Sequence, residues 1–588
     1  MSRLHWVLLG ALVVAAALLR LEHQSQVALL DVLARRPAGD ELTFTTWAHR
    51  VATGHDDAVP YQAPLYPTLL GALEKARGER EVPSDARLLQ ALLGLAAAGL
   101  AALLAFELTR DGRVAVVAFF LAAFARPLIH AEGTLLREAP SAALLAACAL
   151  AYARARSTGS PRDHATLGVA LGLGVLLREN FAVVALVVFT ERLLALRSPS
   201  PRAAGGGSGW GEAFLPLALA LLCFLIPVLP FDVKVARLGD GVHLLPNWNQ
   251  GCVFYIANRR DNATAGDYQP PPFVARGNPE AEVEGFEAEA RRRGHDLHGH
   301  ALSSYWLREG LREVAAAPRL FAFRVAARLL SSLSPVEMAH QRDPDVDAES
   351  SWVLRAPLLD VGVLVALALV GLVFLSPRGK GEVALLIIAA SWWASLLVAA
   401  FTTRYRVPAI PVLAVLGALG ARDLARALAR PDPWRRPRVL ASLIIIVLIF
   451  FGLRLGVAPR DHATALRTRA NSYVQVEDYE NAAKDLRRVL AVRPKEADAW
   501  LLLGMSLLRQ RGPDVWGARD AYLEAARLGQ QDAWHPLGFC ELIARRPHAA
   551  LEALAHCDPH DPQVQSDIAK AREKASQGPD QPVPLPRR

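Results

Sequence analysis

The stretch 165-ATLGVALGLGVLLRENFAVVALVVFTERLLAL-196 decides how many times this chain crosses a membrane and in which direction. It is apolar on both sides of its centre, yet it is too long for a single membrane-spanning helix, which needs about 20 residues. Arg178, Glu179 and Asn180 interrupt it near the middle. Two interpretations are open: one overlong helix, or two short spans joined by a turn at these three residues.

Further apolar runs along the chain are each long enough, or nearly so, to cross a bilayer as a helix. They cover residues 4–21, 87–107, 114–130, 138–153, 213–231, 352–375, 382–401, 408–428 and 438–456. The composition agrees, because 52% of the residues are hydrophobic and the mean hydropathy is +0.22. Soluble domains seldom reach a positive average, since their surfaces must be hydrated. The sequence therefore predicts an all-α polytopic membrane protein.

The distribution of basic residues chooses between the two interpretations of 165–196. Short cytoplasmic loops collect Lys and Arg. If 165–196 is two spans, the basic loops all fall on one side of the membrane, whereas a single span scatters them over both sides. These loops are Arg110–Arg113, Arg154–Arg162, Arg192–Arg202, Arg378–Lys380 and Arg422–Arg438. We therefore predict about eleven spans, with the N-terminus inside and the C-terminus outside.

This topology places two long segments, 22–86 and 231–351, and the C-terminal residues 457–588 outside the cytoplasm. The Gly-rich stretch 198–212 is expected to be a flexible cytoplasmic loop. For 1–21, a cleaved signal peptide is the alternative to a retained span. The net charge of +8 resides in short loops and is explained by membrane orientation, so nucleic-acid binding is not expected. Five cysteines without a CxxC pair indicate neither a zinc site of that type nor a disulfide scaffold.

Four arginines fall on the predicted outer side, against the charge bias: Arg137, Arg178, Arg404 and Arg406. One explanation is that each reaches lipid headgroups or pairs with a neighbouring acid, Glu138 or Glu179. The other is that they meet at one face and bind an anionic group. The planar guanidinium donates two hydrogen bonds at once, which suits phosphate.

Acids occupy the same predicted face. Asp40 and Glu41 precede an expected helix over 42–53, where Asp40 is either a helix cap or a general base. Further on, 63-APLYP-67, which contains Tyr66, predicts a rigid return of the chain towards the membrane. Glu132 and Glu138 lie in the second outer loop; a divalent metal held by this pair is conceivable, but their spacing is a weak signal and no cofactor is predicted.

A repeat of about 34 residues follows the last apolar run, and this period is typical of tetratricopeptide units. The marker residues are Tyr473, Ala482, Leu486, Val489 and Pro494; then Trp500, Leu503, Gly504, Ala518, Tyr522 and Ala525; then Trp534, Leu537, Gly538, Ala550, Leu554 and Pro562. The repeat domain is assigned to 457–574 and a disordered Pro-rich tail to 575–588. Either a protein partner or packing on the membrane domain would explain the repeats. A disulfide between Cys540 and Cys557 is an open alternative to free thiols.

Several of these pieces, in this order, resemble the GT-C class of membrane glycosyltransferases, in particular the bacterial branch related to protein O-mannosyltransferases and aminoarabinose transferases. They are 39-GDE-41, 63-APLYP-67, the run 247-NWNQGCVFYIANRRDNATAGDYQPPP-272, 304-SYW-306 with Pro318, and 403-TRYRVP-408 with Pro411. The resemblance covers roughly residues 1–455. Ala257-Asn258 and Cys252-Val253-Phe254 depart from the family pattern.

The resemblance implies a polyprenyl-phosphate-linked sugar as donor and an acceptor on the outer face of the bacterial inner membrane. It implies that Asp40 and the adjacent Glu41 are the catalytic acids. Substrate would be bound by Glu132, Arg137, Glu138, Arg178, Tyr66, Arg404, Tyr405 and Arg406. No metal is implied, and neither the sugar nor the acceptor is named by the sequence.

Two other functions remain open at this stage. A transporter or flippase of a lipid-linked intermediate would need ionisable groups or broken helices in mid-bilayer, which most of the predicted spans lack. A membrane-anchored scaffold, in which the repeats do the work, would need only one or two spans.

Overall fold

The chain is described by a computed structural model for residues 1–197, 209–262, 269–274, 279–337, 341–375, 379–453 and 462–580. Most of the predicted loop 198–212 and the end of the predicted tail, from residue 581, lie outside these ranges. The chain forms two compact units. The first comprises Met1–Leu30, Gly39–Met338 and Asp347–Ala458, and the second comprises Asp31–Ala38, Ala339–Val346 and Pro459–Arg588.

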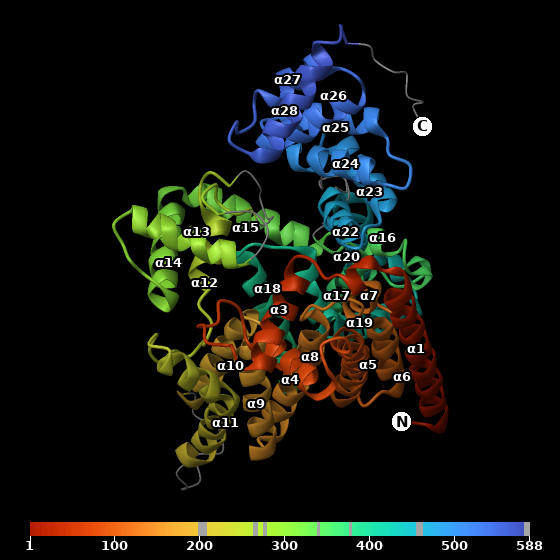
Figure 1. Ribbon diagram of the computed structural model, residues 1–588. Helices are drawn as coiled ribbons and strands as arrows, with labels where there is room; N and C mark the ends of the chain where they lie inside the picture. Colours follow the sequence, from red (N-terminus) through yellow and green to blue (C-terminus); the bar gives the residue numbers. More distant parts are fainter. Residues whose placement is uncertain are drawn as a thin grey trace. The chain divides into compact units, whose positions relative to one another are not determined.

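The first unit is built from helices, many of them apolar (Figure 1). Their bounds are α1 Arg3–Leu30, α3 Asp40–Thr53, α4 Leu65–Arg77, α5 Val82–Thr109, α6 Gly112–Ala123, α7 Arg126–Glu132, α8 Glu138–Thr158, α9 Pro161–Leu177, α10 Asn180–Arg197, α11 Gly209–Arg237, α12 Gln250–Asn258, α13 Pro279–Arg292, α14 Gly299–Ala316, α15 Pro318–Leu333, α17 Val361–Phe374, α18 Lys380–Val398, α19 Ile410–Leu428 and α20 Pro437–Val447. A 3₁₀ segment, Thr403–Ala409, leads into α19.

Within the described residues, five helical segments are long and apolar enough to cross a membrane: Arg3–Leu30, Val82–Thr109, Phe214–Arg237, Lys380–Val398 and Thr403–Leu428. Shorter apolar helices accompany them at Gly112–Ala123, Val361–Phe374 and Pro437–Gly452. The all-α membrane architecture is thereby confirmed. The number of about eleven spans stays a prediction.

The interruption at the centre of 165–196 is a turn between two helices. Helix α9 ends at Leu177 and α10 begins at Asn180, so that Arg178 and Glu179 occupy the corner. Arg178 has extended backbone angles, φ −158° and ψ 135°, which end the helix. The prediction of a break at these residues is confirmed.

Two expected spans differ from the structure. The run 114–130 is divided into α6 and α7, and the run 352–375 begins with a short 3₁₀ turn, Trp352–Arg355, and becomes α-helical only from Val361. The reason is a short backbone pairing between the two interruptions: Arg126 N donates to Leu359 O at 2.9 Å, and Leu359 N donates to Phe124 O at 3.0 Å. Hydropathy cannot reveal this pairing, because both partners lie in apolar sequence.

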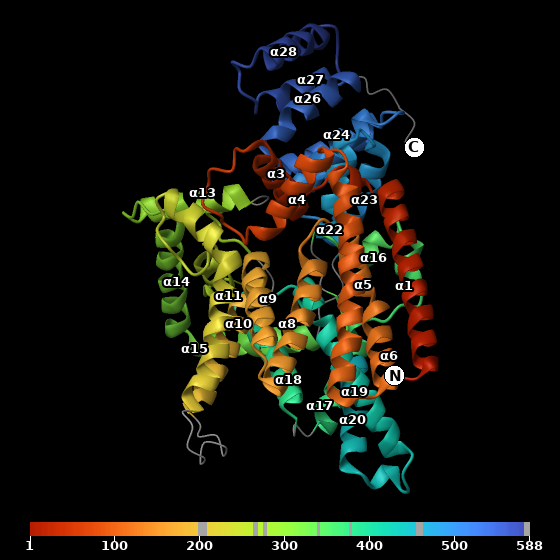
Figure 2. The same ribbon diagram turned by 90° about the horizontal axis from the view of Figure 1, so that it is seen from below.

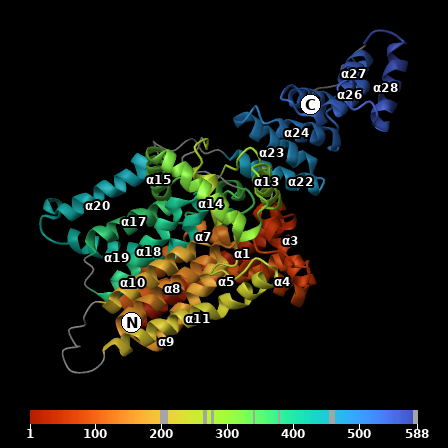
Figure 3. The ribbon, with the colours of Figure 1, turned by 90° about the vertical axis from the view of Figure 1, so that its left-hand side faces the viewer.

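Helices of the first unit pack closely through small residues, as is usual in membranes. Helices α1, α5, α8 and α9 run side by side in sequence order (Figure 2), and α9 also packs along α11 (Figure 3). A Cβ atom at Gly168 would lie 2.1 Å from Ala220 O, and one at Gly172 would lie 2.4 Å from Phe224 O. Gly168 and Gly172 are therefore needed for the contact of α9 with α11.

We expect Gly94→Ala to destabilise the first unit. The new Cβ would lie 1.7 Å from Oε1 of Glu132, which forms a fully buried ion pair with Arg20 at 2.9 Å. Separating a buried pair costs about 3 kcal/mol. Thermal unfolding of the purified protein in detergent should show a clearly lower midpoint. Gly99→Ala is the matched control, because no atom lies within 4 Å of its added Cβ; equal midpoints for the two variants would contradict the expectation.

The second unit contains paired helices, drawn in blue in Figure 1: α22 Ala463–Gln475, α23 Tyr479–Val492, α24 Ala497–Arg509, α25 Val515–Arg527, α26 Trp534–Ile543, α27 Pro547–Leu554 and α28 Pro562–Ala575. The predicted small residues Gly504 and Gly538 lie where helices contact each other. A Cβ atom at Gly504 would lie 2.8 Å from the Tyr522 ring, and one at Gly538 would lie 2.7 Å from the Leu554 side chain. Cys540 and Cys557 are free thiols, so the alternative of a disulfide between them is not realised.

The second unit also includes two segments that come from elsewhere in the chain. Arg342 pairs with Asp31 at 2.6 Å, and His462 Nδ1 lies 2.7 Å from Asp343 Oδ2. On α22, Ser472 Oγ donates to Arg36 O at 2.9 Å. Residues 31–38 and 341–346 are therefore held against the first repeat.

We expect Arg469→Ala to lower the stability of the repeats against unfolding. Its guanidinium makes two hydrogen bonds to the buried carboxylate of Asp485, at 2.7 and 2.8 Å, and one to Val346 O at 3.1 Å. Its removal leaves Asp485 buried without its principal cation, which costs about 3 kcal/mol. Limited proteolysis should cleave residues 462–580 faster in this variant. The exposed Arg527, which contacts only its own helix neighbour Glu524, provides the control as Arg527→Ala; similar cleavage rates would refute the role of Arg469.

Candidate active site

Asp40 lies in the first turn of α3, and Gly39 before it is the capping residue. Gly39 has φ 59° and ψ −132°, a conformation that only glycine adopts readily. The capping position is therefore occupied by Gly39 rather than by Asp40, which stands in the first turn near the positive end of the helix dipole.

Arg404 lies between two acids. Its Nη2 contacts Asp40 Oδ2 at 2.5 Å, and its Nε lies 3.7 Å from Glu138 Oε1. Glu138 begins α8, and Arg404 belongs to the 3₁₀ segment before α19, so three elements far apart in sequence meet here. The Asp40 and Arg404 side chains are each 21% exposed, whereas Glu138 is 4% exposed.

Arg178 completes this group from the corner between α9 and α10. Its Nη1 donates to Glu138 Oε1 at 3.2 Å, and the side chain is 2% exposed. The ring of Tyr405 lies against both guanidinium groups, 4.5 Å from that of Arg178 and 5.5 Å from that of Arg404. Two cations are therefore held close together by one shared carboxylate and one aromatic face.

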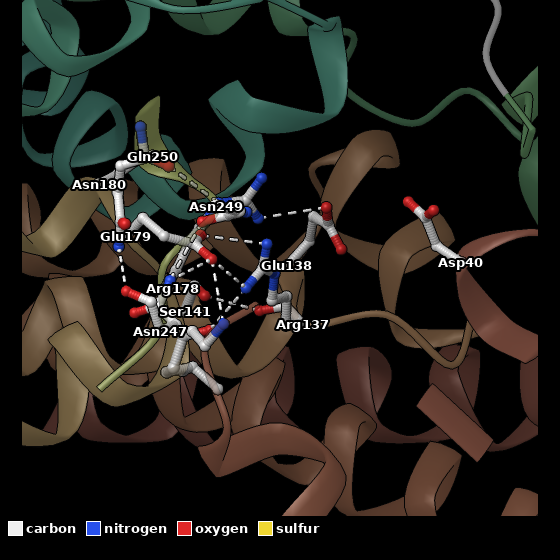
Figure 4. Close-up of polar contacts among 12 residues, drawn as sticks. Asp40, Arg137, Glu138, Ser141, Arg178, Glu179, Asn180, Asn247, Asn249 and Gln250 are labelled. Carbon is white, nitrogen blue, oxygen red and sulfur yellow. Dashed lines mark hydrogen bonds and ion pairs between the residues drawn. The ribbon is translucent and has the colours of Figure 1, made fainter. Parts of the chain in front are cut away.

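A second ion pair lies alongside, between Arg137 and Glu179 at 3.1 Å (Figure 4). Glu179 Oε1 also accepts hydrogen bonds from Ala63 N at 3.1 Å and from Asn247 Nδ2 at 3.2 Å. Burial alone would raise the pKa of Glu179, but Arg137 and backbone N–H donors, including that of Ala63, outweigh it, and the pKa is lowered. Through its hydrogen bonds Glu179 ties the 63-APLYP-67 turn to Asn247 of the large outer loop.

The arrangement balances its charges but leaves one end accessible. Asp40, Glu138 and Glu179 oppose Arg137, Arg178 and Arg404, while Figure 4 shows Asp40 at one side of the group. A phosphate arriving at Arg404 would compete with Asp40 for the same guanidinium. The group can therefore bind an anion and, in the same step, release a carboxylate that accepts a proton.

Two other predicted residues, Tyr66 on α4 and Glu41 on α3, are buried. Tyr66 packs edge-on against Phe44, with ring centroids 5.3 Å apart, and its hydroxyl has no hydrogen-bond partner within the described residues. Burial raises the pKa of Tyr66 well above its usual value, and the negative charge of Glu41 raises it further. Glu41 itself is buried. Its position one residue after Asp40 turns it towards the core rather than the accessible side.

Glu132 and Arg406 make their contacts elsewhere. Glu132 pairs with Arg20 of α1, and Arg406 donates to the carbonyls of Ser332 and Ser334 and pairs with Glu337 at 3.0 Å. Arg137, Arg178 and Arg404 thus lie close together, whereas Arg406 contacts the end of α15. Neither Glu132 nor Glu138 belongs to a cluster suited to a metal in the described part of the chain.

Several polar residues of the group were not singled out from the sequence. Glu179 was noted only as a possible partner for an arginine. Asn180 donates a hydrogen bond to Ser395 Oγ at 2.9 Å and accepts one from Arg178 Nε at 3.2 Å. Asn247 and Asn249 are hydrogen-bonded to each other at 3.2 Å. The signal available was the polar run 247-NWNQ-250 between apolar stretches.

Comparisons with known proteins agree with this arrangement of parts. Residues 62–230 match the family described as "Dolichyl-phosphate-mannose-protein mannosyltransferase", and residues 467–533 match "Tetratricopeptide repeat". Among solved structures, the chain is similar to ArnT from Cupriavidus metallidurans, described as bound to undecaprenyl phosphate. The identity is 15% and the TM-score 0.43, over 99% of this chain and 90% of that one. No curated protein matches.

The family match over 62–230 contains Tyr66, Arg137, Glu138, Arg178 and Glu179, whereas Asp40 and Arg404 lie outside it. The resemblance inferred from the sequence motifs is confirmed within that range, and the repeats are confirmed as tetratricopeptide units. Residues 62–230 are thus similar to the dolichyl-phosphate-mannose-protein mannosyltransferase family, and residues 467–533 to the tetratricopeptide repeat.

Proposed function

We propose that this chain transfers a sugar from a polyprenyl-phosphate donor to an acceptor hydroxyl at the outer face of the bacterial inner membrane. The observation that carries the proposal is the chain of contacts from Asp40 through Arg404 and Glu138 to Arg178. It puts a carboxylate that can accept a proton next to two guanidinium groups that can hold a phosphate.

The steps follow from the charges. The donor phosphate binds Arg404 and Arg178 and displaces Asp40 from its 2.5 Å contact. Asp40 then takes the proton of the acceptor hydroxyl while that oxygen forms a bond to the anomeric carbon. The bond from this carbon to the phosphate oxygen breaks, and its electron pair leaves with the phosphate. The departing group gains one negative charge, which the two arginines stabilise.

Glu138 and Glu179 act as positioning residues in this proposal. Glu138 holds Arg178 and Arg404 close together despite their like charge. Glu179 holds Arg137 and fixes Asn247 at the start of the large outer loop. Because phosphate is a good leaving group, no additional acid is needed to protonate it.

The second compact unit supports the sidedness of the proposal. Its first repeat holds residues 31–38, which follow α1, and residues 341–346, which precede α17. Both segments belong to the long loops predicted to lie outside. In this proposal the repeats share the side of those loops and bind a protein partner there.

Comparing a deletion strain with a strain that carries Asp40→Asn tests the function. Lipid and glycan profiling should show the same accumulated polyprenyl-phosphate sugar and the same missing glycan in both strains. A normal lipid profile in both would reject the transferase. If the glycan were missing in the deletion strain but present in the Asp40→Asn strain, transport or the scaffold alternative would be favoured, because neither needs a proton acceptor.

A further inference from the structure

The turn between α19 and α20 carries a dense run of arginines. The stretch 430-RPDPWRRPR-438 contains four of them, Arg430, Arg435, Arg436 and Arg438, and a single acid, Asp432. Three of these arginines are exposed and Arg436 is half-buried. Asp432 has a left-handed backbone conformation, with φ 49°, and a short 3₁₀ segment, Pro433–Arg435, follows it. The chain therefore reverses within a compact and strongly basic turn.

The positive charge of this turn is not neutralised by the protein. Within the described residues, the side chains of Arg430, Arg435, Arg436 and Arg438 form no ion pair and no hydrogen bond. Even Nε of Arg436, which is shielded from solvent, has no acceptor there. Like charges at such short sequence spacing repel one another. An external anion would therefore be attracted to the turn.

Arginines just before the turn differ, because they have acid partners in the protein. Arg422 Nε lies 2.7 Å from Asp423 Oδ1, and Arg426 lies 4.0 Å from Asp111. The contact of Arg426 with Asp111 also places the end of α19 beside the connection from α5 to α6 (Figure 2). That connection is the loop Arg110–Arg113, which is predicted to face the cytoplasm. The basic turn therefore belongs to the same predicted side.

An apolar helix face begins directly after the arginines. Leu440, Ile444 and Val447 of α20 follow one another at intervals of four and three residues, so they lie on one side of the helix. They are 46%, 58% and 54% exposed, and the segment Pro437–Gly452 is one of the apolar helices. This face suits lipid acyl chains. Trp434, which is 62% exposed, precedes α20 by three residues, and tryptophan is enriched at the level of lipid headgroups.

We propose that residues 430–438 bind the phosphate groups of anionic phospholipids in the cytoplasmic leaflet. The apolar face of α20 holds the turn at headgroup level, where arginine side chains reach phosphate oxygens. Each guanidinium can donate two hydrogen bonds to one phosphate. A nucleic acid or an acidic protein would bind from the aqueous side. The apolar face, however, begins at Leu440, two residues after Arg438, and this spacing commits the turn to the membrane surface.

The bound lipid acts as a counter-ion for the turn. Its phosphate reduces the repulsion among the arginines and so stabilises the connection from α19 to α20. None of the four arginines belongs to the group around Asp40 and Arg404. Lipid binding is therefore measured separately from the proposed sugar transfer, and either can fail while the other holds.

The test is binding of fluorescently labelled phosphatidylglycerol to the full-length protein in a non-ionic detergent. Unlabelled phosphatidylglycerol, phosphatidylcholine and inorganic phosphate serve as competitors. We expect saturable binding that only unlabelled phosphatidylglycerol displaces efficiently and that weakens as salt is added. The double variant Arg435→Gln/Arg438→Gln should bind about 25-fold more weakly, because each arginine near an anionic headgroup contributes about a factor of five.

The double variant Arg291→Gln/Arg312→Gln is the matched control. It removes the same charge, and both arginines are exposed residues of the large outer loop that pair with acids, Glu287 and Glu309. Its affinity for phosphatidylglycerol should be unchanged. The proposal is overturned if this control weakens binding as much, or if Arg435→Gln/Arg438→Gln binds as the unmodified chain does. It is also overturned if phosphatidylcholine or inorganic phosphate displaces the labelled lipid as well as phosphatidylglycerol does. If the double variant does not fold, Arg435→Gln and Arg438→Gln alone decide the question, each with an expected loss of about fivefold.

Discussion

Asp40→Asn should lower the rate of sugar transfer by about 10³-fold, because an amide cannot accept the acceptor's proton. The amide oxygen can still receive a hydrogen bond from Arg404, so the helix start and the fold should be preserved. The measurement is release of polyprenyl phosphate from a polyprenyl-phosphate sugar by the purified protein, with envelope extract of the deletion strain as the source of acceptor.

Glu41→Gln is the matched control for that experiment, because Glu41 is adjacent in sequence but buried away from the accessible side. Its transfer rate should fall far less than that of Asp40→Asn. Comparable losses in the two variants would show that the acidic pair supports the fold and that Asp40 is not the proton acceptor.

Arg404→Lys should reduce transfer by about 10²-fold even though the positive charge is retained. Lysine cannot present the two-pronged donor that reaches both Asp40 and Glu138, and it binds phosphate as a point charge. The apparent affinity for the donor should fall together with the maximal rate, because the same guanidinium holds the phosphate before and after cleavage.

Arg50→Lys serves as the comparison, since Arg50 is an exposed outer arginine that pairs with Glu280 at 3.3 Å. It should transfer sugar at nearly the original rate. If Arg404→Lys did the same, the Asp40–Arg404 contact would be a structural ion pair and the phosphate would have to bind elsewhere.

The sequence predicted which arginines meet at one face better than the direction in which each side chain points. Charge bias located the corner at Arg178 and put Arg137, Arg178 and Arg404 at one face, and the structure gathers these three. Arg404 and Arg406 looked equivalent in sequence. In a 3₁₀ segment, however, with three residues per turn, positions two apart point in different directions.

Contacts between distant segments were not predictable from local patterns. The pairing of Glu132 with Arg20 joins residues 112 apart, and that of Asp31 with Arg342 joins residues 311 apart. Each residue is consistent with several partners until the helices are packed. The predicted domain boundary at 457 likewise could not include 31–38, because no repeat pattern marks that segment.

The proximity of Asp240, His243 and His300 was not predictable from motif spacing, because these residues are separated by up to 60 positions in the chain. Their proximity depends on the close approach of Gly299 to the Asp240 carboxylate. Such a cluster emerges only once the loop is folded.

The most direct test of the central claim uses the purified full-length chain in sealed vesicles that contain a polyprenyl-phosphate sugar labelled in the sugar. Envelope extract of the deletion strain is added outside, and both the label on the acceptor and the free polyprenyl phosphate are measured. We predict that the two appear in equal amounts and that neither appears with Asp40→Asn. Labelled lipid that crosses the vesicle membrane intact, without release of polyprenyl phosphate, would contradict the account.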